Sequence, residues 1–286
     1  MSTRLLAGLL WIIHWIPFRV MGWLAQPIGY ALYLLLKRRR KIGAVNLTLC
    51  FPDWSPSQRS SVLRQHFCQA AQLFLAYSIL YWGSEQRIRR LVKVEGEHHP
   101  QAHQEQPVIL LSPHFLALDF GGMRYAMERD GSAYLASQRG AFNEISLRIR
   151  RRFRQTLLVP RAEGIRPIIR ALKQGIAFYY LPDQDLGPKE SIFVPFFGVQ
   201  TATIPALSRI AQISKAVVIP MIATLEGNHI VLRFEAAWEN FPSSDMEADT
   251  LRMNQFIEQR VLAHPSQYFW LHRRFKTRPE GEASPY

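Results

Sequence analysis

The sequence predicts an α/β fold in which a mixed, mostly parallel sheet is flanked by helices. Four short apolar runs alternate with stretches long enough to form helices, which is typical of parallel strands joined by helical crossovers. A later pair of apolar runs is separated only by Glu226-Gly227-Asn228, a tight-turn sequence that predicts an antiparallel hairpin. The predicted strands are 108–111, 133–137, 157–159, 176–181, 216–225 and 229–236.

The first element is hydrophobic, and we predict that residues 1–36 form a membrane anchor. Val20–Leu36 is a run of 17 mostly apolar residues, which is the short limit for a helix that crosses a bilayer. Five consecutive cations, residues 37–41, follow at once and mark the cytoplasmic side. Whether the anchor crosses the bilayer or lies in its interface stays open, and a core helix with a solvated basic end is the alternative.

Residues 37–96 are predicted to form a basic exit and a helical segment, and residues 97–286 the α/β domain. Ser55-Pro56 is a typical helix start, and the helix that follows should run to Trp82, just before Gly83. The helices expected in the α/β domain are 120–129, 142–154, 163–173, 203–213 and 248–263, the last opened by a capping box at 244–247.

The charge of the chain indicates an anionic partner. The formal net charge is +13, which suits nucleic acid, an anionic bilayer, or an acidic protein or phosphorylated substrate. No zinc-finger spacing, helix-turn-helix or RNA-recognition pattern supports nucleic acid. Cys50 and Cys68 lie in apolar contexts without metal-binding spacing, so we expect reduced core thiols.

The central candidate for chemistry is His114, which follows the predicted strand 108–111 within three residues. Asp119 lies five positions later, near the start of the next helix. A histidine held by a carboxylate at the carboxyl end of a strand is the usual arrangement of a general base and the residue that orients it. A capping aspartate beside a loop histidine is the alternative.

Two further groups of polar residues are expected at the same edge of the sheet. Asp183 and Asp185 follow the strand 176–181, although two aspartates in a turn can be plain turn chemistry. Arg139 ends another predicted strand and Arg166 lies near a helix start, and guanidinium groups suit phosphate. Arginines also crowd residues 148–154, where an anionic lipid surface, an acidic carrier protein and a solvated face are all possible roles.

The end of the chain, residues 267–281, closely resembles the C-terminal signature of the late acyltransferases of lipid A biosynthesis in Gram-negative bacteria. Residues 46–52, His114 with Asp119, and the segments 183–187 and 194–198 match further motifs of this family in order. The complete ending looks more like the lauroyl branch than the myristoyl one. Three positions depart from the family pattern: Asp119 in place of Glu, Gln184 in place of His, and Gly140 in place of the Pro that follows the family's Arg.

The resemblance implies a glycerolipid-acyltransferase-like fold and an enzyme of the inner membrane with its catalytic domain on the cytoplasmic side. The expected reaction moves a fatty acyl chain from acyl carrier protein, which carries phosphopantetheine, to a hydroxyl of a Kdo-lipid A precursor. No separate cofactor and no metal are expected, and inner membrane phospholipid is the expected surrounding.

In that reaction His114 would be the general base and Asp119 its orienting carboxylate. Arg139 and Arg166 would hold acceptor phosphate or the developing oxyanion, and Asp183 and Asp185 would shape the substrate site. Two alternatives stay open. One is an acyltransferase for another membrane lipid, such as a glycerophosphate or an amino lipid. The other is a non-enzymatic, membrane-tethered scaffold that binds anions.

Overall fold

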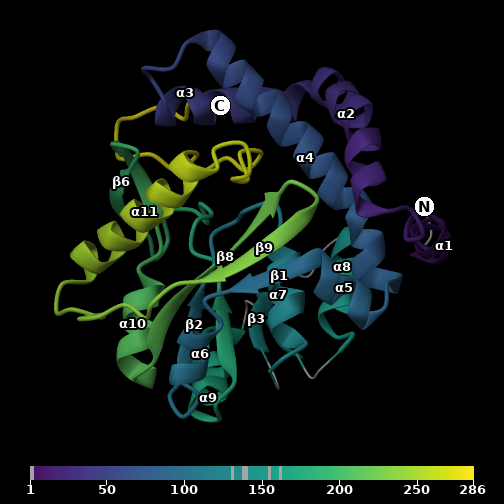
Figure 1. The fold of residues 1–286 in the computed structure, drawn as a ribbon. Coiled ribbons are helices and arrows are strands. Elements are labelled where there is room, and N and C mark those ends of the chain that lie inside the picture. Colours follow the sequence, from purple (N-terminus) through teal and green to yellow (C-terminus); the bar gives the residue numbers. More distant parts are fainter. Residues whose placement is uncertain (1–2, 130–131, 137–140, 154–155, 161–162) are drawn as a thin grey trace.

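A seven-stranded sheet forms the centre of the computed structural model, which describes residues 3–129, 132–136, 141–153, 156–160 and 163–286 (Figure 1). The strand order is β1-β9-β8-β2-β5-β3-β4, and all neighbours are parallel except the hairpin of β8 and β9. This confirms the predicted mixed, mostly parallel sheet. The strands are β1 (Val92–Glu95), β2 (Val108–Leu111), β3 (Ser132–Ala136), β4 (Thr156–Pro160), β5 (Ala177–Tyr180), β8 (Val217–Glu226) and β9 (His229–Phe234).

Helices cover both faces of this sheet, which explains why its central strands are apolar throughout. In β2 the side chains alternate: Val108 and Leu110 join one buried cluster, and Ile109 and Leu111 join the other. Residues of α5, α7 and α8 belong to the first cluster, and residues of α9, α10 and α11 to the second. These helices are α5 (Glu85–Leu91), α7 (Leu118–Ala126), α8 (Ala141–Arg150), α9 (Arg166–Lys173), α10 (Ala206–Ser214) and α11 (Met246–Ala263). A short helix, α6 (His98–Ala102), precedes β2.

The first 82 residues of the chain add four helices along one side of the molecule (Figure 1). They are α1 (Thr3–Ile13), α2 (Phe18–Leu35), α3 (Lys37–Cys50) and α4 (Pro56–Trp82). The helix α4 begins as predicted, with a capping box between Ser55 and Gln58 and proline in the first turn. Its first half packs into one buried cluster and its second half into the other.

The helix α2 packs closely against α4 because Gly29 lies at the crossing. A Cβ atom at this position would be only 2.4 Å from the Cα of Cys68, so no larger residue fits without moving a helix. Within the described residues, no helix taken alone has the length and hydropathy needed to cross a membrane. The segments Leu5–Ile13 and Phe18–Leu35 reach these values only as a pair, and the chain bends by 118° between them.

Four features of the fold differ from the sequence-based expectation. The basic run begins a regular helix, α3, and the apolar segment near residue 195 forms a separate hairpin, β6 (Ile192–Phe196) with β7 (Val199–Thr203). The helix expected from residue 203 therefore begins later, at Ala206. The main sheet also takes its first strand, β1, from before residue 97.

Candidate functional site

Two adjacent parallel strands bring the candidate residues together at the carboxyl edge of the sheet. Leu111 at the end of β2 is in register with Tyr180 at the end of β5, and the amide of Ser112 extends this pairing to the carbonyl of Tyr180 at 2.9 Å. His114 and Asp183 each follow within three residues of their strand. The edge therefore places them side by side, as expected for ligand sites in sheets of this kind.

The imidazole of His114 is held by Asp183. Its Nδ1 lies 2.7 Å from Oδ1 of Asp183, and the backbone N–H of His114 donates to Oδ2 at 2.9 Å. Burial alone would raise the pKa of Asp183, but the charge of His114 and the hydrogen bonds from it hold the pKa below its ordinary value. A carboxylate that accepts from Nδ1–H leaves Nε2 as the basic nitrogen. The side chain of His114 keeps 18% of its surface exposed, so a substrate can reach it.

The predicted pair of imidazole and carboxylate therefore forms with Asp183, and the expectation that Asp119 makes this contact is wrong. Asp119 lies in the first turn of α7, where it meets residues of two other helices. Arg150 of α8 donates to Oδ1 of Asp119 at 2.7 Å, and the hydroxyl of Tyr77 of α4 donates to Oδ2. Burial would raise the pKa of Asp119, but Arg150, Tyr77 and the nearby charge of His114 lower it.

Asp185 ties the loop after β5 to the C-terminal segment. It is 1% exposed, and its carboxylate accepts from the amide and the hydroxyl of Thr277 at 2.7 and 2.9 Å. The backbone N–H of Asp185 donates to Nε2 of His272 at 3.0 Å. The carboxylate thus has a bracing role in the fold of this edge.

The C-terminal segment also holds the backbone around His114. The amide of Phe269 donates to the carbonyl of His114, and the amide of Leu116 donates to the carbonyl of Gln267, both at 2.8 Å. The side chain of Gln267 in turn bonds both backbone groups of Leu225 at the end of β8. Asn46 of α3 donates to the carbonyl of Trp270 at 2.7 Å, so the early and late motifs meet in space.

Five residues of this site were missed as site candidates. Tyr77 and Arg150 bind Asp119, while Tyr268, His272 and Arg274 surround Asp183 and His114. Arg274 is 3% exposed and donates to the carbonyl of Ala202 at 2.8 Å. Burial and the charge of His114 lower the pKa of His272 to about 4, so its ring is neutral at neutral pH. Four of these residues lie in patterns visible in the sequence: Arg150 in the arginine-rich stretch 148–154, and the other three in the C-terminal signature 267–281. Only Tyr77 lies outside any motif.

Two predicted site residues remain, Arg139 and Arg166. Arg139 lies outside the described residues. Arg166 is the exposed first residue of α9, and no hydrogen bond or ion pair described around His114 involves it. Within the described part of the chain, no cluster of three or more His, Cys, Asp or Glu could hold a metal ion.

The sequence model of a protein family, the bacterial lipid A biosynthesis acyltransferases, matches residues 2–277 of this chain. The chain is 32% identical to the lipid A biosynthesis lauroyltransferase of Escherichia coli (strain K12), over 99% of this chain and 94% of the relative. It is 31% identical to the palmitoleoyltransferase of the same strain, over 98% of this chain and 92% of the relative. It is 32% identical to the lipid A biosynthesis myristoyltransferase of the same strain, over 87% of this chain and 79% of the relative.

A solved structure, the 1-acyl-sn-glycerophosphate acyltransferase from Thermotoga maritima, aligns with a TM-score of 0.40 at 14% identity, covering 86% of this chain and 97% of that one. Relatives named for three different acyl chains are almost equally similar, so identity alone does not select the chain length. The match over nearly the whole sequence means that this chain belongs to the bacterial lipid A biosynthesis acyltransferase family and is an O-acyltransferase.

Proposed function

We propose that the protein transfers a lauroyl chain from acyl carrier protein to a hydroxyl of a Kdo-lipid A precursor. The observation that carries the mechanism is the imidazole of His114, fixed by Asp183 at the carboxyl edge of the sheet and reachable from solvent. The resemblance of the C-terminal signature to the lauroyl branch supports the lauroyl chain, and the family resemblance supports the carrier protein as its donor. One of the relatives is named a lauroyltransferase.

In this mechanism Nε2 of His114 removes the proton from the acceptor hydroxyl as its oxygen attacks the thioester carbonyl. The new ester C–O bond forms, the C–S bond breaks, and the imidazolium returns the proton to the leaving thiolate of phosphopantetheine. Asp183 keeps Nδ1 protonated and stabilises the imidazolium. General-base help of this kind contributes about 10²–10⁴-fold.

The other predicted residues have supporting roles in the proposal. Asp119, fixed by Arg150, adds a second negative charge near the ring. Arg139 and Arg166 bind acceptor phosphate or the developing oxyanion. Asp185 keeps the loop of Asp183 and the C-terminal segment in place.

We also propose that the enzyme works at the cytoplasmic face of the inner membrane and that α1, α2 and the end of α4 contact lipid. These helices expose large apolar side chains, and several of them are tryptophans, which favour the boundary between lipid and water. Examples are Leu5 (68%) and Ile12 (63%) of α1, Trp23 (62%) and Leu35 (74%) of α2, and Phe74 (56%) of α4, and Trp15 (67%) lies in the turn between α1 and α2.

The test is an acyl transfer assay with purified protein, carrier protein loaded with lauroyl, myristoyl or palmitoleoyl chains, and either the Kdo-lipid A precursor or glycerol phosphate as acceptor. We expect the fastest transfer with lauroyl and the lipid A precursor. His114→Ala should lower kcat by about 10²–10⁴-fold. The matched control is His98→Ala, because His98 is exposed on α6. Transfer to glycerol phosphate alone, or full activity of His114→Ala, would overturn the proposal.

A further inference from the structure

A groove lies between α3 and the start of α4, beside the basic run of residues 37–41. It has a volume of about 350 Å³ and lies on the side of α3 away from Asn46, which faces the C-terminal segment. We call it the α3–α4 groove. Its lining residues are Tyr33, Lys37, Arg40, Lys41, Ala44, Thr48, Pro56, Arg59, Ser60 and Leu63.

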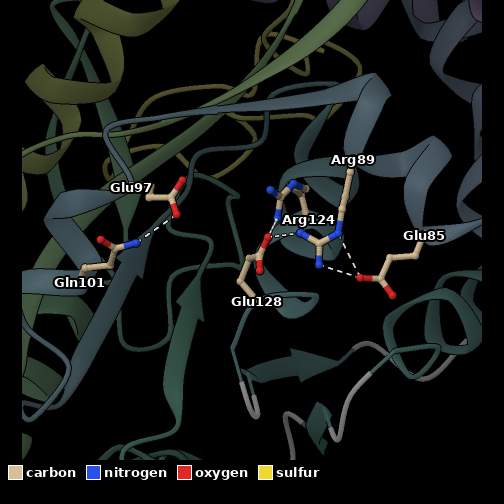
Figure 2. A network of polar contacts seen from close by, with 6 residues as sticks. All are labelled: Glu85, Arg89, Glu97, Gln101, Arg124 and Glu128. Carbon is tan, nitrogen blue, oxygen red and sulfur yellow. Dashed lines mark hydrogen bonds and ion pairs between the residues drawn. The ribbon is translucent and has the colours of Figure 1, made fainter.

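The described residues that line the groove include four cations and no carboxylate. Some arginines elsewhere are paired with carboxylates: Figure 2 shows Arg89 and Arg124 both reaching Glu128, and Arg89 also binds Glu85 at 2.6 Å. Lys37 and Lys41 lie one turn apart on α3, are exposed, and form no ion pair with the described residues. Like charges gathered without a counter-charge repel one another, so an anion that enters the groove is stabilised by all four.

The two arginines of the groove are held in place without losing their charge. Arg40 lies over the ring of Tyr33 at 5.1 Å and donates to the carbonyl of Tyr33 at 3.3 Å. Arg59 donates to the carbonyls of Phe51 and Pro52 at 2.9 and 3.2 Å, where α3 ends. Carbonyl groups orient a guanidinium but do not neutralise it, and the hydroxyls of Thr48 and Ser60 add possible donors.

The helix α2 contributes Tyr33 to the groove and exposes apolar side chains next to it. Tyr33 stacks on Tyr30 with ring centroids 6.5 Å apart, and Tyr30 is 50% exposed. Leu34, Leu35 and Leu36 directly precede Lys37 in the sequence and are 43–74% exposed. The chain thus joins a cationic groove to exposed apolar residues, a combination that suits a phosphate headgroup with its acyl chains.

We propose that the α3–α4 groove binds the phosphate of an anionic phospholipid of the surrounding bilayer, a lipid that is not the substrate. The inference rests on the proposed contact of α1 and α2 with lipid. The bound phosphate would anchor the start of α3, and through Asn46 of the same helix it would steady the segment that braces His114. An acidic carrier protein fits less well, because the site is a concave groove and the residues directly before Lys37 are exposed leucines.

The test compares two variants that each lose two positive charges. The groove variant, Lys37→Gln combined with Lys41→Gln, removes the two lysines that line the groove. Arg38→Gln with Arg64→Gln is the matched control, because both arginines are exposed on the same two helices but do not line the groove. Flotation measures binding to neutral phosphatidylcholine vesicles and to vesicles that also contain about one-fifth phosphatidylglycerol.

On the anionic vesicles we expect the groove variant to bind about tenfold more weakly than wild type, and the control less than about threefold more weakly. On neutral vesicles all three proteins should bind alike. Equal losses of vesicle binding in the two variants would overturn the proposed phosphate site, because general surface charge would then explain the binding. Failure of the wild type to bind any vesicle would instead overturn the proposed membrane contact.

Kinetics in neutral detergent micelles separate the remaining occupants. We expect the groove variant to keep the wild-type KM values for both the acyl carrier protein and the lipid A precursor. A raised KM for the carrier protein would identify the groove as a protein docking site, and a raised KM for the precursor would identify it as a site for acceptor phosphate. Either result would overturn the proposal.

Discussion

Two carboxylates lie near the imidazole of His114, and they have different partners. Asp183, whose side chain is fully buried, is paired with the imidazole itself. Asp119, whose side chain is 13% exposed, is paired with Arg150, a permanent cation, and with Tyr77. In the proposed mechanism the negative charge of Asp183 is therefore available to the imidazolium, whereas most of the charge of Asp119 is already compensated.

This comparison predicts the largest effect for Asp183→Asn. The substitution removes the charge that selects the tautomer of His114 and stabilises the imidazolium, so kcat should fall by about 10²–10⁴-fold. Steady-state acyl transfer measures the loss. The matched control is Asp245→Asn at the N-cap of α11, where asparagine caps as well as aspartate does. If the Asp183 variant is about as active as the control, Asp183 is not the carboxylate that supports His114 in the reaction.

Asp119→Asn should have a smaller effect, a loss of about 10–100-fold in kcat. The residue acts on the ring through space and through the placement of α7 and α8, without a direct hydrogen bond to the ring. The same assay, run beside the Asp183 variant, gives the order of the two effects. A larger loss for Asp119→Asn would identify Asp119 as the partner that matters in the reacting enzyme.

The stability of the fold should show that Asp119 and Arg150 act as a pair. Asp119→Asn leaves a guanidinium short of its counter-charge, and Arg150→Gln leaves a partly buried carboxylate short of its own. The double variant should therefore be less destabilised than the sum of the single variants, by about 1–3 kcal/mol. Denaturant unfolding measures this coupling. Combining Arg150→Gln with Asp183→Asn is the control, and strong coupling there would contradict two separate pairs.

Acid should affect both carboxylates in the same direction, with the smallest effect. The pKa of each is lowered in the folded state, so the stabilisation is complete above the ordinary carboxyl pKa of about 4 and is lost as the pH falls through the lowered value. Each Asn variant should show a shallower fall of the unfolding free energy below about pH 4 than the wild type. An unchanged slope in either variant would show that the corresponding pKa is not lowered.

The sheet and the position of His114 could be predicted because apolar runs locate strand ends directly. The prediction of β2 matched the structure at both ends, and the hairpin turned at Gly227, whose φ of +58° suits glycine. The partner of His114 could not be predicted in the same way. It depends on β2 lying beside β5, and strand order is not written in the spacing of residues along one chain.

The helical contributions to the site were harder still. Tyr77 and Arg150 reach Asp119 from α4 and α8, which are far apart in sequence, and only the packing of helices on the sheet brings them together. The helix α3 was not predicted, because its first five residues are all cations and show no apolar periodicity. Its buried face is formed later in the helix, by residues such as Ile42, Asn46 and Leu47. The hairpin of β6 and β7 was not predicted, because its aromatic residues suit a buried core in any type of element.

The contacts between the C-terminal segment and the loop of His114 determine when the site can form during synthesis of the chain. The residues from Gln267 to Thr277, which hold the histidine loop and Asp185, leave the ribosome after every strand of the main sheet. A nascent chain can therefore complete its sheet while the edge that carries His114 still lacks these contacts. We expect a premature stop between β9 and Gln267 to leave a chain that forms the sheet but does not transfer an acyl group.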